Sequence, residues 1–267
     1  MNIKRLAVGV LVAIFVAVPA VHAFAFGPDR TTYTCNSSGQ CVGADHVQFN
    51  SFTNNPVYGD ERNFLTVRDA DAGTNTYTDN MALTAGKTYV IRFYVHNNAQ
   101  QDLSGVNNYV AHNTAVRVAM PSEVNGSGQV TGYISASNAG PGSVFDDFTF
   151  TSGSKLDLQY VAGSAKIRTN GQTDVTISDA IVGAGAPVGF SSQNGDWPGC
   201  FDFSGWVTLQ VKAVAPPTPT PTPVTPAKTT PKALPNTGAG DVVGIFAGAS
   251  AAGTAAHMAI TARRNRR

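Results

Sequence analysis

The chain has 267 residues, a formal net charge of +1 and only 13% charged residues. Between Pro28 and Val214, however, 16 acidic residues outnumber 10 basic ones, because many basic residues lie near the two ends of the chain. This acidic balance argues against nucleic acid or anionic lipid as a partner, since both need a basic surface. The scarcity of glutamate and the abundance of glycine, threonine, serine and asparagine favour an all-β fold.

The N-terminus has the features of a secretory signal peptide. Two basic residues precede an apolar run from Leu6 to Val18, and small residues follow. This run is too short for a transmembrane helix, and a cleavage site follows it directly. We therefore expect residues 1–25 to form a signal helix that is removed after Ala23 or after Ala25. The residues do not distinguish these two cleavage sites.

The region 26–214 has the periodicity of β-strands. Apolar residues alternate or cluster in short segments, and turn residues separate these segments, for example at 125–128 and 139–142. No segment has a sustained helical period with caps. We predict an antiparallel β-sandwich, and the shortness of 139–142 favours one elaborated sandwich over two packed ones. The predicted strands are 46–49, 63–67, 88–95, 114–120, 129–136, 145–151, 156–161, 165–168, 174–178 and 205–214.

Three cysteines in an exported chain suggest one disulfide and one remaining thiol. Cys35 and Cys41 enclose the turn-rich loop 36–40, so we expect them to form the bridge. A loop this short gives little chain-entropy stabilisation, and the bridge is therefore expected to pin an N-terminal hairpin rather than to hold the fold together. Cys200 lies among large apolar residues, which favours a buried side chain over a nucleophile and leaves its state open.

Asp69, Asp71 and Asn75 place oxygen ligands at alternate positions, as calcium loops do. The downstream bidentate glutamate is missing, and these residue types are also common at hairpin tips, so a calcium site and a plain turn both remain open. The histidines and cysteines are too scattered for a zinc site. We expect no resident metal and no cofactor.

No catalytic motif is present, and we expect the protein not to be an enzyme. There is no Gly-x-Ser-x-Gly elbow, no His-Glu-x-x-His motif and no phosphate-binding glycine loop. A hydrolase site could be assembled only from distant residues such as Asp60, Glu61 and His96, although His96 is more simply the polar end of a strand.

Two other uses of surface residues remain open. Trp197, together with Tyr58 and Tyr94, is a candidate glycan platform, although a tryptophan in such a loop also serves as a plug at the end of a sandwich. A Lys–Asn isopeptide bond is possible for some of the lysines. Its candidates are Lys87, Lys155 and Lys166.

The composition changes after Val214. Residues 215–233 form a Pro/Thr-rich tract that is too polar to bury a core, and we expect a disordered polyproline II stalk that reaches on the order of 60 Å. An LPNTG pentapeptide follows, and 239–267 combine an apolar run, long enough to span a bilayer but rich in Ala and Gly, with a basic tail. The pentapeptide consists of Leu234, Pro235, Asn236, Thr237 and Gly238.

This order of motif, apolar helix and basic tail resembles the sorting signal of LPXTG surface proteins, which sortase attaches to the bacterial cell wall. The resemblance implies that the sortase thiolate attacks the carbonyl of Thr237, releases the chain from Gly238 onward and joins Thr237 to peptidoglycan. The implied partners are sortase, peptidoglycan and, transiently, the membrane. The implied location is the cell surface. Independently, Pro235 favours the extended conformation that an enzyme groove can bind.

A second, looser resemblance covers about half of the region 26–214. Strand-like segments ending in an Asn-rich corner at 94–98 and before Pro121, and a Gly-Ser-Ala turn at 163–165, look like the DUF11-type immunoglobulin-like surface modules. Such modules imply a spacer or an adhesive scaffold with an unidentified surface ligand. The alternatives are a surface-anchored hydrolase and a passive coat protein. A cleft with paired carboxylates or a His/Ser pair would favour the hydrolase, an aromatic patch the binder, and a featureless polar surface the spacer.

Overall fold

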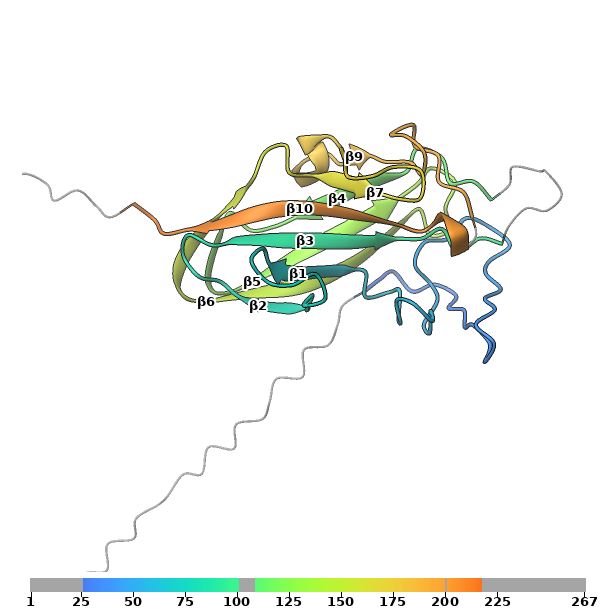
Figure 1. The fold of residues 1–267 in the computed structure, drawn as a ribbon, viewed down its shortest axis with the longest axis horizontal. Coiled ribbons are helices and arrows are strands. Elements are labelled where there is room, and N and C mark those ends of the chain that lie inside the picture. The colour runs from blue at the N-terminus through green and yellow to red at the C-terminus, as the bar shows by residue number, and fades with distance from the viewer. Residues whose placement is uncertain (1–25, 101–108, 200, 218–267) are drawn as a thin grey trace, which may run out of the picture. The chain divides into compact units, whose positions relative to one another are not determined.

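The computed structural model describes residues 26–100, 109–199 and 201–217 (Figure 1). These residues belong to one compact unit, and a second unit begins at Pro219. The predicted signal helix, most of the stalk, the LPNTG motif, the C-terminal apolar run and Cys200 lie outside the described residues. Within the described ranges, no helix is long and apolar enough to cross a membrane.

The described residues confirm the all-β prediction, because they form a mostly antiparallel sheet and contain only two short 3₁₀-helices. The strands are β1 (Leu65–Asp69), β2 (Asn80–Ala82), β3 (Thr88–Val95), β4 (Ala115–Ala119), β5 (Glu123–Ser135), β6 (Ser143–Tyr160), β7 (Lys166–Arg168), β8 (Val175–Thr176), β9 (Ala186–Pro187) and β10 (Gly205–Val214). The 3₁₀-helices are η1 (Asp179–Val182) and η2 (Phe201–Phe203).

The strands are hydrogen-bonded in the order β1-β3-β10-β6-β5-β4-β9, with β2 beside β6 and with β7 joining β10 to β8. Most long strands have one buried and one outer face, as period-2 alternation requires, although in β3 Val90 and Tyr94 on the outer face are covered as well. In β10, for example, Val207, Leu209 and Val211 are fully buried. Trp206 and Thr208, which alternate with these residues, are partly exposed. On β1, β3, β7 and β10, the outer face is therefore formed by the even-numbered residues.

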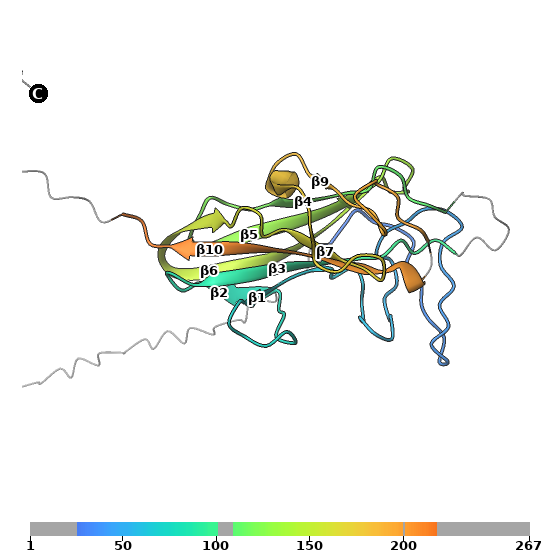
Figure 2. The same cartoon turned by 45° about the horizontal axis from the view of Figure 1, so that its top comes forward.

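The sheet folds back so that β5 and β6 pack against β1 and β3. A Cβ atom added to Gly132 in β5 would lie 2.6 Å from a methyl carbon of Leu65 and 2.7 Å from the ring of Phe93. The backbone N–H of Leu65 also donates a hydrogen bond to Oδ2 of Asp146 in β6, at 2.7 Å. The core between these strands is aromatic and aliphatic. Figure 2 shows the strands of the sheet from a second direction.

Two predicted strands have the predicted bounds, and others differ for identifiable reasons. β3 and β10 cover 88–95 and 205–214. The segments 145–151 and 156–161 are parts of the single strand β6. The predicted turn 125–128 lies inside β5, where Gly126, with φ +85°, follows a shift of register and bends the strand without ending it.

The predicted strand 46–49 is not a strand, although its apolar residues Val47 and Phe49 are buried. Its backbone oxygens accept hydrogen bonds from loops, with Gly140 N–H donating to Val47 and Asn98 N–H donating to Gln48. Asn50 then turns the chain with φ 48°. Burial without a partner strand explains why the alternation misled the prediction.

The loops gather at one end of the strands, and the chain leaves from the other. Gly205 pairs with Val95, whereas Lys212 pairs with Thr88, so the loops after β3 and before β10 share an end. The irregular N-terminal segment 26–64 lies at this same end, which we call the loop end (Figure 1). The described chain continues past Val214 at the opposite end.

Candidate functional site

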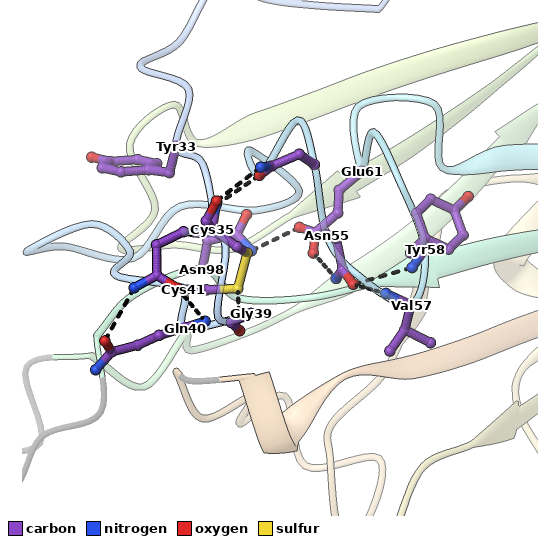
Figure 3. Close-up of a disulfide and its surroundings, with 12 residues drawn as sticks. Tyr33, Cys35, Gly39, Gln40, Cys41, Asn55, Val57, Tyr58, Glu61 and Asn98 are labelled. Carbon is purple, nitrogen blue, oxygen red and sulfur yellow. Dashed lines mark hydrogen bonds between the residues drawn. A yellow bond between two sulfur atoms is a disulfide. The ribbon is translucent and has the colours of Figure 1, made fainter.

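The N-terminal segment covers the loop end and is held there by a disulfide and by asparagine side chains. Cys35 and Cys41 are bonded, which confirms the predicted bridge (Figure 3). Asn54 accepts a hydrogen bond from the backbone N–H of Cys35 at 2.6 Å and donates to its carbonyl at 2.9 Å. Inside the loop, Oδ1 of Asn36 accepts from the N–H groups of Ser38 and Gln40. The bridge thus closes a small self-bonded loop.

The N-terminal segment also contains a buried carboxylate, that of Glu61, which contacts three side chains. Oε1 of Glu61 lies 2.8 Å from Nδ1 of His96 and accepts from Nδ2 of Asn55 at 2.5 Å, and Oε2 accepts from Nδ2 of Asn98 at 2.8 Å. The side chains of Glu61 and His96 have no exposed surface. A charge in such surroundings is tolerated only when hydrogen bonds satisfy it, as they do here.

Two further residues extend this network into the backbone. Asn50 donates to the carbonyls of Glu61 and Tyr94 and accepts from the backbone N–H of His96 at 3.0 Å. Oδ1 of Asn98 accepts from both the backbone N–H and the hydroxyl of Ser51. The network therefore ties the irregular segment 26–64 to the end of β3, and we call these residues (Asn50, Ser51, Asn55, Glu61, His96 and Asn98) the buried polar network.

The hydrolase set considered from the sequence is brought together only in part. Glu61 and His96 are in contact, but both are buried, whereas Asp60 forms a surface ion pair with Arg62 at 2.6 Å. An acid or base must come within hydrogen-bond reach of its substrate, which this burial prevents. A second His–carboxylate pair, His112 with Asp196 at 2.8 Å, is half-exposed at the loop end. Ser137 beside it donates to the carbonyl of His112, not to its ring.

The candidate calcium residues have other partners. Oδ1 of Asp69 accepts from the backbone N–H of Asp71, and Oδ2 forms an ion pair with Lys87 at 2.5 Å. The pKa of Asp69 is lowered chiefly by this hydrogen bond from Lys87. Arg68 Nη1 donates to three carbonyls of the same loop, at 2.9 to 3.0 Å. Within the described ranges, no three His, Cys, Asp or Glu residues are grouped as metal ligands would be.

The candidate aromatic platform is built differently from the expectation. Trp197 is fully buried, and its Nε1 donates to the carbonyl of Phe203 at 2.6 Å, so it is a plug in the core. Tyr58 and Tyr94 instead stack on each other at 4.2 Å and pack against Trp206, whose ring centroid lies 5.5 and 4.8 Å from theirs. Trp206 is partly exposed on the outer face of β10.

The sequence contained a signal for this second cluster. Tyr94 and Trp206 occupy even positions of two predicted strands, which places each on the face opposite the apolar odd positions. Only the pairing of β3 with β10, which sets Trp206 directly opposite Tyr94, shows that they share a face. Strand pairing between segments more than one hundred positions apart has no local signal.

One more buried acid lies where β6 meets β1. Asp146 has no exposed surface, and desolvation by burial raises its pKa to about 8. Nearby, burial lowers the pKa of the Arg30 guanidinium to about 10, and Arg30 donates to the carbonyl of Asn50 at 2.7 Å. These groups lie inside the fold, so they bear on stability rather than on contact with a ligand.

No protein-family model, curated protein or solved structure matches this chain.

Proposed function

We propose that this chain is a sortase substrate, displayed on the bacterial cell wall for adhesion or envelope structure. The order of LPNTG motif, apolar run and basic tail at 234–267 carries the proposal. In this proposal, Thr237 becomes joined to peptidoglycan and the C-terminal helix is held in the membrane only transiently. The Cys35–Cys41 bridge supports export, because disulfides persist in oxidising compartments.

The position of the chain exit supports display. β10 ends at Val214, at the opposite end of the strands from the loop end, and the Pro/Thr tract follows directly. A stalk that begins there would point the loop end away from the wall. The disulfide-closed loop, the buried polar network and the half-exposed His112–Asp196 pair would then be the most distant parts from the anchor.

We propose an immunoglobulin-like β-sandwich as the displayed domain. The close approach of β5 to Leu65 and Phe93, with apolar side chains between, supports two packed layers. Of the three functional classes, the binder is best supported, because the partly exposed rings of Tyr58 and Trp206 pack over the buried Tyr94 on the outer face of β10. The burial of Glu61 and His96 gives the hydrolase no comparable support.

The anchoring step is tested on cell envelopes digested with a muramidase, by mass spectrometry of the C-terminal peptide. We expect a peptide that ends at Thr237 and carries a peptidoglycan fragment. A Pro235→Ala variant should shift the protein from the wall to the membrane fraction, whereas Pro231→Ala, just upstream of the motif, should not. A wild-type peptide that continues through Gly238 into the apolar segment would overturn the proposal.

A further inference from the structure

The outer face of the sheet carries a row of polar and aromatic side chains that the fold itself does not use. Thr66 of β1 pairs with Arg92 of β3, Arg92 with Thr208 of β10, and Thr208 with Lys166 of β7. Trp206 lies beside this row, between Tyr94 and Arg168. Arg92, Thr208, Lys166 and Trp206 point away from the core, because their neighbours along each strand are buried, whereas Thr66 and Tyr94 are themselves covered.

Arg92 at the centre of this row has aromatic partners but no acidic one. Its guanidinium carbon lies 3.6 Å from the ring centroid of Tyr77 and 4.4 Å from that of Trp206. Its Nη2 makes one long hydrogen bond, 3.4 Å, to the hydroxyl of Thr66, and its buried Nε has no partner within the described parts of the chain. Stacking covers the faces of the guanidinium and leaves its in-plane N–H groups as the donors for a ligand.

Two other arginines nearby are neutralised by ion pairs, and Arg68, which stacks on the same Tyr77 ring, donates instead to three backbone carbonyls. Arg62 pairs with Asp60 and Arg168 pairs with Asp174. Among the residues that the structure describes, Arg92 and Lys166 have no ion-pair partner. Two cations on one face thus remain unpaired in a region whose overall charge is acidic.

Two hollows adjoin Arg92 and share Tyr77, Arg92 and Trp206 as a common wall. The first, about 320 Å³, extends to Lys166, Thr208 and the Arg168–Asp174 ion pair. The second, about 430 Å³, extends to Tyr58, Asn63 and Asp79. Each has the size of a small-molecule site. We call the two together the Arg92 groove.

The second hollow contains unsatisfied acceptors. Oδ1 of Asn63 and Oδ1 of Asp79 are buried there without a partner in the described chain, although Nδ2 of Asn63 donates to the other oxygen of Asp79 at 3.1 Å. The groove therefore offers a cationic donor at one end and oxygen acceptors at the other.

We propose that the Arg92 groove binds a carboxylated oligosaccharide. The sugar carboxylate accepts hydrogen bonds from Arg92 and lies near the ammonium of Lys166, a charge-assisted arrangement that arginine favours. Hydroxyl groups of the neighbouring ring occupy the second hollow, which Asn63 and Asp79 line. The apolar C–H face of a sugar ring packs against the exposed parts of Tyr77 and Trp206.

A peptide ligand fits this groove less well. Peptides that add to a sheet do so at an unpaired edge, where main-chain groups are available. β3 and β10 are paired on both sides, so their backbone groups are already used and only side chains can recognise a ligand on this face. The abundance of donors and acceptors on side chains, with aromatic walls, matches the chemistry of a sugar.

The inference deepens the proposed function, since it names the ligand class of an adhesive surface protein, but its test does not depend on anchoring. Isothermal titration calorimetry is performed on the purified full chain with a galacturonate tetramer, a hyaluronan tetrasaccharide and sialyllactose as probes. The neutral N-acetylglucosamine tetramer is the uncharged counterpart. We expect at least one carboxylated probe to bind, and the neutral tetramer to bind at least about tenfold more weakly.

Arg92→Gln should weaken binding about tenfold or more, because it removes the charge-assisted contact. The matched control is Arg117→Gln, since Arg117 also lies on a strand and stacks on a tyrosine, 4.1 Å from the ring of Tyr133, but outside the groove. Lys166→Gln, at an exposed position, provides a second variant if Arg92→Gln fails to fold, and should weaken binding at low salt.

Three results would each overturn the inference: no carboxylated probe binds at millimolar concentration, the neutral tetramer binds equally well, or binding survives both groove substitutions. Binding together with a C-terminal peptide that runs through Gly238 would instead contradict only the wall anchor. A C-terminal peptide that ends at Thr237, found together with no sugar binding, would contradict only the proposed ligand class.

Discussion

Nδ1 of His96 lies 2.8 Å from Oε1 of Glu61, and both side chains are completely buried where the N-terminal segment crosses the end of β3. Two asparagines donate to the same carboxylate: Asn55 lies within the N-terminal segment, whereas Asn98, like His96, follows β3, so Glu61 joins the segment to the end of β3. This arrangement resembles a catalytic dyad only in composition. Because the pair is buried, it stabilises the packing of the loop end rather than contacting a substrate.

Glu61→Ala should therefore destabilise the fold strongly. The substitution leaves His96, Asn55 and Asn98 as buried groups without their acceptor, and breaking a buried charged contact costs about 3–5 kcal/mol. Urea denaturation measures the loss. Glu123→Ala is the matched control, because Glu123 forms an exposed pair with Lys155 and should matter little. Equal stability of the two variants would contradict a structural role for the network.

Asp146 should make stability fall as pH rises. Its folded pKa of about 8 lies above its ordinary value of 3.8, so between these values the folded state holds a proton that the unfolded state has lost. Its contribution is fully present below about pH 4 and is lost as pH rises through 8, with a slope of at most about 1.4 kcal/mol per pH unit. Burial also raises the pKa of Asp79 and Asp147, which acts in the same direction.

Asp146→Asn should flatten this dependence, because an amide does not ionise and its oxygen can still accept from the N–H of Leu65. Urea midpoints at pH 5 and pH 8 provide the comparison. Asp157→Asn, at a partly exposed position of the same strand, should leave the slope unchanged. A wild-type protein that is equally stable at both pH values would contradict the proposed protonation of Asp146.

Replacing Cys35 and Cys41 together by serine should loosen the loop end without unfolding the domain. The bridge spans a sequence separation of 6, and so short a loop contributes about 2 kcal/mol by chain entropy. Hydrogen exchange should increase at the amides of Gly39 and Gln40, which are bonded to Asn36. The amides of β3 and β10 provide the internal control. Loss of their protection as well would show that the bridge holds the whole fold.

Gly132→Ala should cost about 1–3 kcal/mol by overpacking, because the new methyl group would meet the side chains of Leu65 and Phe93. Gly153→Ala is the matched control, since nothing lies within 4 Å of a Cβ atom at that position in β6. Thermal unfolding of the two variants compares them directly. A neutral Gly132→Ala would contradict the close packing of β5 on β1 and β3.

Much of the strand content could be predicted from local pattern. β10 alternates buried and outer residues along its whole length, and β3 is a short run of mostly apolar residues between turn residues, so their bounds followed from the sequence. The Cys35–Cys41 bridge also followed, because both cysteines flank one short turn-rich loop. By contrast, the glycines at 126 and 128 suggested a turn, whereas pairing with β6 on both sides of Gly126 keeps the strand continuous.

The candidate sites depended on contacts that no local pattern encodes. Trp197 was predicted in a loop and Trp206 in a strand, yet Trp197 is buried in the core and Trp206 borders the Arg92 groove. The sequence identified Glu61 and His96 as candidate site residues. It indicated neither that they are in contact nor that both are buried.

By itself, the sequence determined the all-β class, the short disulfide and the bounds of β3 and β10, because each depends on residues close together in the chain. Only the tertiary structure decided which outer-face residues meet. Arg92 pairs across strands with both Thr66 and Thr208, residues distant from each other in sequence. Strand order and register are set by how all the strands bury their apolar faces together, and that is a property of the whole fold rather than of any segment.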